Sequence, residues 1–231
     1  MSLKVGGFQE LSLLDYPGKV ASIIFLINCN FRCKYCYNPD LLSDKHFNES
    51  NRKLFGAKKI LHNLSSTKKM IDGVVITGGE PTVNPDLVEF IKEIKSMGLF
   101  VKLDTNGSNP AMLKQLIDEK LIDYVAMDIK SPLDKYAELC GYKDTDKIKE
   151  SLEILKTSNI LREFRTTVWP TFDVNDIERI AKLIPGETLY LQQLLQPDAL
   201  TDEAKTIKNY TRIDIEDLVK LVVSDCTIIV R

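Results

Sequence analysis

The stretch on which the fold and chemistry of this chain depend is "VASIIFLI" (20–27), followed after one residue by "CNFRCKYC" (29–36). The apolar, β-branched run predicts a buried strand at about 20–27. Three cysteines, Cys29, Cys33 and Cys36, then lie just beyond its carboxyl end. Because parallel α/β sheets bind ligands at the carboxyl ends of their strands, we expect these thiols to belong to a functional site.

The composition of the 231-residue chain is that of a globular protein, with 44% hydrophobic and 28% charged residues. The formal net charge is −2, and a general nucleic-acid binder usually has a clustered excess of basic residues, which this composition does not indicate. No apolar run approaches the roughly 20 residues that span a bilayer, and the start of the chain has no apolar segment of signal-peptide type. We therefore expect one domain, residues 1–231, in the cytoplasm, with neither a membrane nor a nucleic acid as partner.

The cysteine spacing favours a metal centre. Cytosolic thiols are kept reduced, and the chain has five cysteines, an odd number, so a disulfide framework is not indicated. Three thiolates spaced C-x3-C-x2-C can hold a [4Fe–4S] cube and leave one iron without a protein ligand. The alternative is zinc held by Cys29, Cys33, Cys36 and a fourth ligand such as His46. No second pair of zinc ligands follows His46, so the cluster is the favoured interpretation.

Strand-like and helix-like segments alternate along the chain, which predicts an α/β fold with a parallel sheet and right-handed crossovers. Six such units could close into a barrel or an incomplete barrel. The predicted strands are 20–27, 73–77, 99–104, 123–129, 162–168 and 187–193, with a short last strand at 227–231. The predicted helices are 51–64, 85–97, 109–120, 144–158, 174–184 and 212–223.

Three further polar segments follow predicted strands: "TGGEP" (77–81), "DTNG" (104–107) and "MDIK" (127–130). Taken singly, each is explained by a turn or by a solvated strand end. Glycines before Glu80 also let backbone approach a ligand closely. Because the carboxyl ends of parallel strands share one edge of a sheet, we expect these segments and the thiols to form one site.

With these segments in place, the sequence resembles the radical S-adenosylmethionine (SAM) enzymes. Their C-x3-C-x-aromatic-C motif matches Cys29, Cys33, Tyr35 and Cys36, and their Gly-Gly-Glu-Pro motif matches residues 78–81. The resemblance extends over most of the chain. It implies a partial (β/α)6 parallel barrel of radical SAM type and an oxidoreductase activity.

A narrower resemblance is carried by "DYPGK" (15–19), "YCYNP" (35–39) and "MDIK" (127–130). These segments look like the activating enzymes of glycyl-radical enzymes, most of all the anaerobic ribonucleoside-triphosphate reductase activating proteins, and also the pyruvate formate-lyase activating enzymes. The partner implied is a glycyl-radical enzyme, either anaerobic ribonucleotide reductase or a pyruvate formate-lyase-like enzyme, with flavodoxin or ferredoxin as electron donor. One departure is Tyr37, which stands where many of these activases have His.

The resemblance also implies the cofactors. The three cysteines would hold a [4Fe–4S] cluster, and the amino and carboxylate groups of SAM would chelate its fourth iron. One electron would then cleave SAM to methionine and a 5′-deoxyadenosyl radical that abstracts hydrogen from the substrate. Gly78, Gly79 and Glu80 match the segment that receives the methionine amino group. Tyr35 matches the aromatic residue near the adenine, and we assign Tyr37 to the same cofactor site.

Other SAM contacts fall in the second half of the chain. Asp128 and Lys130 match the strand-end pair that reaches the ribose or carboxylate of SAM. Arg165 is a candidate carboxylate partner because its guanidinium can donate to two oxygens. Related enzymes often place a His near the sixth strand, where this chain offers glutamines. We assign Gln193, with Gln192 and Gln196 as alternatives.

The remaining assignments concern a cation and the partner. Asp104, Thr105 and Met127 match positions that frame a monovalent cation in pyruvate formate-lyase activating enzymes. Asp104 and Thr105 are also grouped, together with Asn106, with the SAM-binding residues. Asp15 matches an aspartate that contacts the glycyl-loop peptide in related activases.

Two other functions compete with the activase interpretation. A compact radical SAM enzyme could act on a small molecule, as the deazapurine-forming members do, and Tyr37 in place of His motivates this alternative. A non-catalytic binding module stabilised by zinc is the third candidate, and metal analysis would distinguish it. Cys140 and Cys226, far from the cluster in sequence, are interpreted as isolated thiols.

Overall fold

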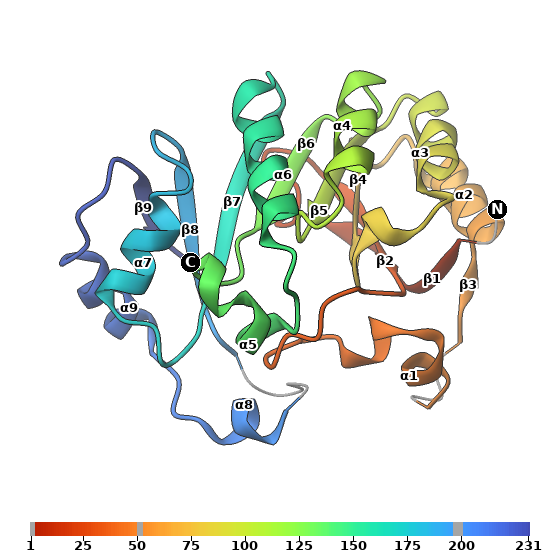
Figure 1. Cartoon of the computed structure of the whole chain (residues 1–231). Coiled ribbons are helices and arrows are strands. Elements are labelled where there is room, and N and C mark those ends of the chain that lie inside the picture. The colour runs from red at the N-terminus through yellow and green to blue at the C-terminus, as the bar shows by residue number, and fades with distance from the viewer. Residues whose placement is uncertain (1–2, 50–52, 196–200) are drawn as a thin grey trace. The chain divides into compact units, whose positions relative to one another are not determined.

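The computed structural model describes residues 3–49, 53–195 and 201–231 (Figure 1). Contacts group the chain into two compact units. The first consists of Met1–Asn30, Asp40–Thr105 and Asn109–Val125, and the second of Phe31–Pro39, Asn106–Ser108 and Ala126–Arg231. The expectation that residues 1–231 form one domain stays a prediction.

The first unit is built on a sheet whose central strands are parallel. Strand β2 pairs with β4 and β4 with β5 in parallel, while β1 pairs antiparallel with both β2 and β3. Ile24, Ile76 and Leu103 lie side by side across the three parallel strands and are fully buried. The strands are β1 Lys4–Ser12, β2 Ala21–Leu26, β3 Phe55–Gly56, β4 Gly73–Gly78 and β5 Phe100–Thr105.

Amphipathic helices cover this sheet. In α3, Leu87, Phe90, Ile91 and Ile94 recur at spacings of three and four, and all four are buried. Helices α2 and α3 contact each other and lie side by side in Figure 1. The helices are α1 Asp44–Glu49, α2 Ala57–Thr67, α3 Leu87–Ser96 and α4 Pro110–Asp118, and the 3-10 turns are η1 Pro39–Leu42 and η2 Pro81–Val83.

The second unit contains three parallel strands in the order β7-β8-β9. Strand β6 begins in the first unit and ends in the second, where the amide of Ile129 donates to the carbonyl of Arg165 in β7 (2.8 Å). The strands are β6 Tyr124–Asp128, β7 Leu161–Val168, β8 Thr188–Gln193 and β9 Thr227–Val230. The helices are η3 Leu133–Lys135, α5 Tyr136–Cys140, α6 Thr145–Thr157, α7 Val174–Ala181, α8 Asp202–Thr206 and α9 Arg212–Val219.

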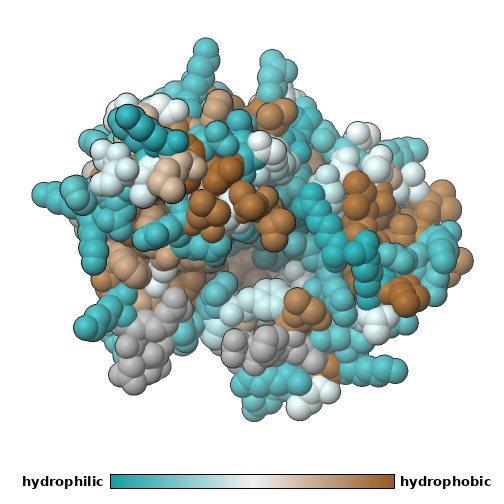
Figure 2. All heavy atoms as spheres, turned by 180° about the vertical axis from the view of Figure 1, so that it is seen from behind, coloured by the Kyte–Doolittle hydropathy of each residue, from teal (hydrophilic) through white to brown (hydrophobic). Residues whose placement is uncertain are grey.

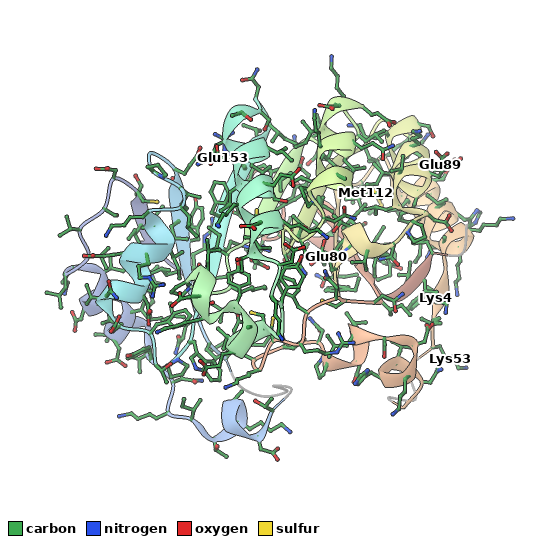
Figure 3. The ribbon with its side chains drawn as sticks, viewed as in Figure 1. Lys4, Lys53, Glu80, Glu89, Met112 and Glu153 are labelled. Carbon is green, nitrogen blue, oxygen red and sulfur yellow. The ribbon has the colours of Figure 1, made fainter. Side chains whose placement is uncertain are left out.

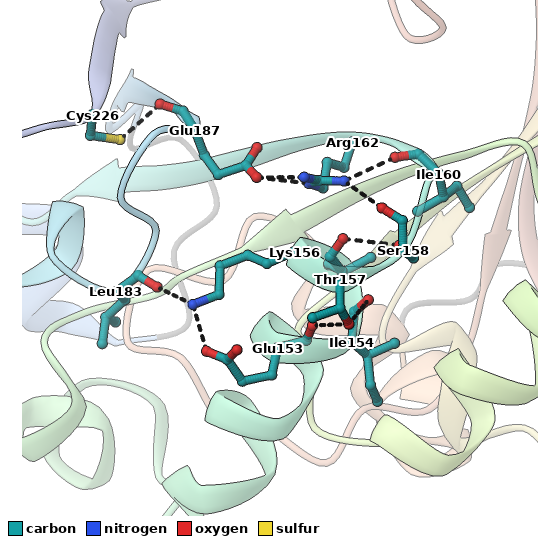
Figure 4. Close-up of polar contacts among 11 residues, drawn as sticks. Glu153, Ile154, Lys156, Thr157, Ser158, Ile160, Arg162, Leu183, Glu187 and Cys226 are labelled. Carbon is teal, nitrogen blue, oxygen red and sulfur yellow. Dashed lines mark hydrogen bonds and ion pairs between the residues drawn. The ribbon is translucent and has the colours of Figure 1, made fainter.

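Polar contacts tie together the amino ends of β7, β8 and β9 (Figure 4). The Arg162 guanidinium donates to the Glu187 carboxylate through Nε (3.1 Å) and Nη2 (2.5 Å), and through Nη1 to the carbonyls of Ser158 and Ile160. The Cys226 thiol donates to the carbonyl of Glu187 (3.1 Å). Side chains at this edge are therefore used to hold the strands, and Cys226 has a local structural role.

Each predicted strand is present, with ends shifted by no more than two residues, and the α/β class with mostly parallel pairing is confirmed. Helix α2 begins at Ala57 rather than at residue 51, because Phe55 and Gly56 pair with Val5 and Lys4 of β1. Residues 51 and 52 of the predicted helix lie outside the described residues. Elements that the sequence did not predict include β1, β3, α1, α5 and α8.

The face of the molecule shown in Figure 2 carries hydrophilic side chains over much of its area, with apolar side chains between them. Among the most exposed apolar side chains of the chain are Leu13 (67%) and Leu14 (91%), in the turn that joins β1 to β2. Over the described parts of the chain, no helix has the length and apolar character needed to cross a membrane.

Candidate functional site

Gly78 and Gly79 lie directly against the backbone that leads to the first cysteine. The amide of Gly79 donates to the carbonyl of Leu26 (2.8 Å), and the amide of Glu80 donates to that of Asn28 (2.7 Å). A Cβ on Gly79 would lie 2.2 Å from the Asn28 oxygen, and one on Gly78 would lie 2.3 Å from the Leu26 oxygen. Gly78 also has φ +117, which favours glycine. Packing against the segment before Cys29 therefore requires both glycines.

Glu80 is a buried carboxylate held by hydroxyl groups. Its side chain is 1% exposed, and Oε1 accepts hydrogen bonds from Oγ1 of Thr105 (2.7 Å) and from the amide (3.1 Å) and Oγ1 (2.5 Å) of Thr82. Figure 3 shows Glu80 among closely packed side chains, whereas Glu89 points outward from α3. The structure thus joins Glu80 to Thr105, two residues assigned from sequence, and adds Thr82, which was not.

Asp104 already has a cationic partner in this chain. Its Oδ1 lies 2.6 Å from Nζ of Lys102, and the Lys102 side chain is only 3% exposed. The Lys102 ammonium also lies 5.9 Å from the centre of the Tyr124 ring. Residues two apart on a strand share one face, so this pair was visible in "KLD" but was not predicted. The assignment of Asp104, Thr105 and Met127 to a monovalent cation stays a prediction. Lys102 already places a positive charge beside Asp104.

Asn106 and Met127 have clear structural roles in the second unit. Oδ1 of Asn106 accepts from the amide of Ser108 (2.9 Å), which makes a tight turn. Gly107 has φ +74, and a Cβ there would lie 2.1 Å from Cε of Met127. The Met127 side chain is fully buried. The predicted roles of these two residues toward SAM or a cation therefore stay predictions.

The loop at residues 29–36 carries Cys29, Cys33 and Cys36. All five cysteines of the chain are described, and none of them is in a disulfide. Cys33 is buried, and Cys29 and Cys36 are partly exposed. A hydrogen bond with Cys140 and burial raise the pKa of Cys33, and burial raises that of Cys36.

In residues 3–49, 53–195 and 201–231, no three His, Cys, Asp or Glu side chains are grouped closely enough to hold a metal ion as they stand. The donor set of the loop, three thiols within eight consecutive residues, nevertheless fits an iron–sulfur cluster by its chemistry and by the short chain that links it.

Asp128 is the centre of a charged cluster in the second unit. Its Oδ1 accepts from Nε of Arg165 (2.8 Å), and its Oδ2 accepts from Nζ of Lys130 (3.0 Å). Burial alone would raise the pKa of Asp128, but the two cations outweigh it and hold the pKa well below its usual range. Burial would lower the pKa of Lys130, but Asp128 outweighs it and raises the pKa. The three residues assigned from sequence thus form one connected group.

Tyr35 lies beside this cluster. Its hydroxyl donates to the carbonyl of Lys130 (3.4 Å), and its ring lies 6.0 Å from that of Trp169. Burial raises the pKa of Tyr35, so it stays protonated. The hydroxyl of Tyr136 accepts from the amide of Lys130 (3.0 Å). No sequence pattern pointed to Tyr136, because its helix α5 is too short to show a hydrophobic period.

Tyr37 contacts the segment that follows Gln193. The Tyr37 hydroxyl accepts a hydrogen bond from the amide of Leu195 (2.8 Å), two residues after Gln193. The amide of Gln193 pairs with the carbonyl of Arg231 (3.4 Å), and its side chain is half-buried. Gln196, the other candidate in this segment, lies outside the described residues. The assignments of Tyr37 and Gln193 to the cofactor site stay predictions.

Asp15 lies away from the other candidates of the first unit. It is in the turn between β1 and β2, at the amino end of β2, where Ser12 donates to its Oδ2 (2.5 Å). Cys29 and Glu80 follow the carboxyl ends of β2 and β4. Six residues of strand separate the two edges, which is about 20 Å. The structure therefore does not bring Asp15 together with Glu80.

Comparison with known proteins gives a consistent result. The model of the Radical SAM superfamily matches residues 23–184. A putative glycyl-radical enzyme activating enzyme of Methanocaldococcus jannaschii is 35% identical over 229 residues, which cover 96% of this chain and 92% of the relative. The pyruvate formate-lyase-activating enzyme of Clostridium pasteurianum is 26% identical over 220 residues, covering 92% and 87% of the two chains.

A solved structure supports the fold. SuiB of Streptococcus suis bound to S-adenosylmethionine superposes with a TM-score of 0.62 at 16% identity, covering 89% of this chain. This chain spans about half of the length of SuiB, 48%. At this identity the likeness concerns the fold alone, and together with the family match it confirms the predicted fold class.

Proposed function

The chain belongs to the radical SAM superfamily of enzymes, which use a [4Fe–4S] cluster and SAM, and we propose that it installs a glycyl radical on a separate partner enzyme. Anaerobic ribonucleotide reductase is the partner that we propose first. The observation that carries the proposal is the 35% identity to a putative glycyl-radical enzyme activating enzyme, which extends over nearly the full length of both chains.

Cys29, Cys33 and Cys36 would hold the cluster. When bound, the cluster supplies the electron that splits SAM into methionine and a 5′-deoxyadenosyl radical, which takes a hydrogen atom from a glycine of the partner. The chain's own part is to supply three thiolates and to keep water from them. The burial of Cys33 and the partial burial of Cys36 support this part.

The first unit would contribute to the methionine end of SAM. The segment Gly78–Glu80 presents backbone at close range, since neither glycine has room for a Cβ. Glu80 is buried, and the hydroxyls of Thr105 and Thr82 donate to one of its carboxylate oxygens. A fixed carboxylate suits an ammonium group such as that of methionine.

The second unit would contribute to the ribose, the carboxylate and the adenine. Asp128 stays ionised because two cations flank it, and it orients both Lys130 and Arg165. These cations are candidates for the SAM carboxylate, and Asp128 is a candidate for a ribose hydroxyl. Tyr35 and Trp169, whose rings lie 6.0 Å apart, offer apolar surface for the adenine.

The turn between β1 and β2 is a candidate contact for the partner protein. Asp15 is exposed there, and the neighbouring Leu13 and Leu14 are 67% and 91% exposed. Adjacent exposed apolar side chains are a feature of protein interaction sites. A flavodoxin or ferredoxin as electron donor and a cytoplasmic location complete the proposal.

The test is anaerobic. Reconstituted protein, SAM, dithionite and purified anaerobic ribonucleotide reductase are incubated together, and the product is examined by electron paramagnetic resonance. The proposal predicts a glycyl doublet that is lost when the partner's radical glycine is replaced by Ala. SAM cleavage without any doublet, on this partner or on a pyruvate formate-lyase-like enzyme, would count against the activase function.

A further inference from the structure

Glu163 is a buried carboxylate of the second unit that has no role in the proposed function. Its side chain is 4% exposed, and its two oxygens face two different cations. Oε2 accepts a hydrogen bond from Nη1 of Arg231 (3.2 Å), and Oε1 lies 3.9 Å from Nη1 of Arg165. The longer distance is that of an ion pair without a hydrogen bond. Glu163 therefore lies between Arg165, a candidate for the SAM carboxylate, and Arg231, which directly follows β9.

The pairing of the strands explains how Arg231 reaches Glu163. Strand β8 lies between β7 and β9 (Figure 1), and Tyr190 of β8 is paired with Arg165 of β7 and with Ile229 of β9. Residues two apart on a strand share a face, so Glu163 lies on the face of Arg165, and Arg231 lies on the face of Ile229. Paired residues of neighbouring strands also face the same way. Arg231 can therefore contact Glu163 by passing over Tyr190.

The Arg231 side chain is held in this position by two other contacts. Its amide donates to the carbonyl of Leu191 (2.8 Å), which continues the pairing of β9 with β8. Its guanidinium lies on the ring of Tyr190, with Cζ 3.5 Å from the ring centre, and the face of an aromatic ring attracts a guanidinium. The side chain is 43% exposed. These contacts, more than burial, direct it toward Glu163.

The ion pairs of Glu163 continue into the group around Asp128. Nε of Arg165 donates to Asp128 (2.8 Å), whose other oxygen accepts from Lys130 (3.0 Å). Cations and carboxylates thus alternate along a series of five side chains: Lys130, Asp128, Arg165, Glu163 and Arg231. Because the series begins and ends with a cation, it has one more positive than negative charge. This excess suits a ligand that carries a carboxylate.

We propose that Arg231 is a positioning residue for SAM, which neutralises Glu163 and thereby leaves the Arg165 guanidinium available to the SAM carboxylate. The inference rests on the proposed assignment of Arg165 to SAM. Without Arg231, the charge of Glu163 would draw on Arg165, whose guanidinium would then serve two carboxylates of the protein. A cation that is shared in this way attracts a further carboxylate less strongly. Arg231 acts through Glu163 and not by touching SAM.

The expected effect is moderate because Arg231 is partly exposed, so that water screens its charge. Removing this charge should weaken SAM binding roughly threefold to tenfold. Replacing Glu163 by Gln in the same protein should restore the affinity, because the carboxylate that competes for Arg165 is then absent as well. A merely structural role predicts the opposite order, since a second substitution at a buried position would add to the damage of the first.

Binding of SAM is measured by equilibrium dialysis on the reconstituted protein without reductant, so that no SAM is cleaved. Arg231→Met removes the charge and keeps a stem that can lie on Tyr190. Arg231→Lys keeps the charge, and the double variant Glu163→Gln/Arg231→Met removes both partners. Arg162→Met is the matched control, because Arg162 pairs with Glu187 near the opposite end of the same strand. Thermal unfolding of each variant reports stability separately.

We expect Arg231→Met to bind SAM roughly threefold to tenfold more weakly than the unchanged protein. Arg231→Lys, the double variant and Arg162→Met should bind it nearly as well as the unchanged protein, although Arg162→Met should unfold at a lower temperature. If Arg231→Met does not fold, Arg231→Gln takes its place, because its amide can still donate to Glu163 but carries no charge.

Equal affinity of Arg231→Met and the unchanged protein would overturn the inference, and so would a double variant that binds SAM no better than Arg231→Met. Both results leave the proposed function standing. An unchanged protein that carries a full cluster but neither binds nor cleaves SAM would overturn the proposed function itself.

Discussion

The Oδ1 atom of Asp128 at the end of β6 lies 2.8 Å from Nε of Arg165 in β7. This contact joins the carboxyl end of β6 to the neighbouring strand β7. Lys130 adds a second cation on the other oxygen of the same carboxylate (3.0 Å). One carboxylate therefore orients both cations that we assign to SAM, and most of what the second unit offers to a ligand depends on it.

Replacing Asp128 by Asn should destabilise the protein. Arg165 and Lys130, with side chains 13% and 19% exposed, would lose their shared counter-charge. We expect a loss of roughly 2–3 kcal/mol in the free energy of unfolding, because the partners are largely but not fully buried. Urea denaturation of the cluster-free protein measures it. Asp118→Asn, an exposed partner of Lys114, is the matched control and should change stability by less than about 0.5 kcal/mol.

The contribution of Asp128 should depend on pH. Its pKa is lower in the folded protein than the value of about 3.9 expected when unfolded, so the unfolded chain binds the proton more readily. The stabilisation is therefore fully present above about pH 4 and is lost as the pH falls below that value. The difference in unfolding free energy between the unchanged protein and Asp128→Asn should shrink between about pH 4 and pH 2. A constant difference would contradict the ion-pair interpretation.

Gly79→Ala should prevent the close approach of the Gly-Gly segment to the backbone before Cys29. Its Cβ would lie 2.2 Å from the carbonyl oxygen of Asn28, and backbone cannot give way as a side-chain tip can. We expect a loss of roughly 2–3 kcal/mol in the free energy of unfolding. Gly56→Ala is the control, because a Cβ there meets nothing within 4 Å and the φ of −72 suits alanine. Equal stability of the two variants would refute the packing argument.

Thr105 should matter for the orientation of Glu80. Thr105→Val keeps the shape of the side chain but removes the hydroxyl that donates to Oε1 of Glu80 (2.7 Å). We expect SAM affinity, measured by equilibrium dialysis on the reconstituted protein, to fall roughly tenfold, as for loss of one hydrogen bond to a charged group. Thr105→Ser keeps the donor and should bind nearly as well as the unchanged protein. If Thr105→Val and Thr105→Ser bind SAM with similar affinity, the Thr105 hydroxyl does not contribute to SAM binding.

The strands could be predicted from sequence because their apolar runs are buried where the strands are parallel. Ile24, Ile76 and Leu103, all fully buried, belong to such runs. Strand β1 was missed because "KVGGFQELS" has two glycines and an exposed half, and its pairing with β2 depends on the turn between them. Helix α5 has five residues, which is less than two turns, so no hydrophobic period could reveal it.

The candidate site was predictable in its residue types and less so in its contacts. The grouping of Asp128, Lys130 and Arg165 agrees with the strand-end interpretation, because β6 and β7 are adjacent. The backbone hydrogen bonds from Arg32 to Cys140 and from Lys34 to Leu139 join segments far apart in sequence, and no local pattern encodes them. Asp15 shows the opposite case, in which a motif match assigned a role but the turn lies at the amino edge of the sheet.

Metal analysis of variants should distinguish the three loop cysteines, which we assign as cluster ligands, from Cys226. Cys29→Ala, Cys33→Ala and Cys36→Ala should each lose most of the iron after anaerobic reconstitution, since each removes one of the three thiolates. Cys226→Ala should keep it, because its thiol bonds a backbone carbonyl near the amino ends of β8 and β9. Full iron and sulfide in any of the first three variants would remove that cysteine from the ligand set.

Cleavage of SAM by the isolated protein would show that the chain carries out radical SAM chemistry. The protein is reconstituted anaerobically until four irons and four sulfides are bound, then given dithionite and SAM, and the products are separated by chromatography. We expect methionine and 5′-deoxyadenosine in equal amounts, with neither formed by Cys33→Ala. A protein that binds zinc instead, or that carries a full cluster and forms no 5′-deoxyadenosine, would contradict this expectation.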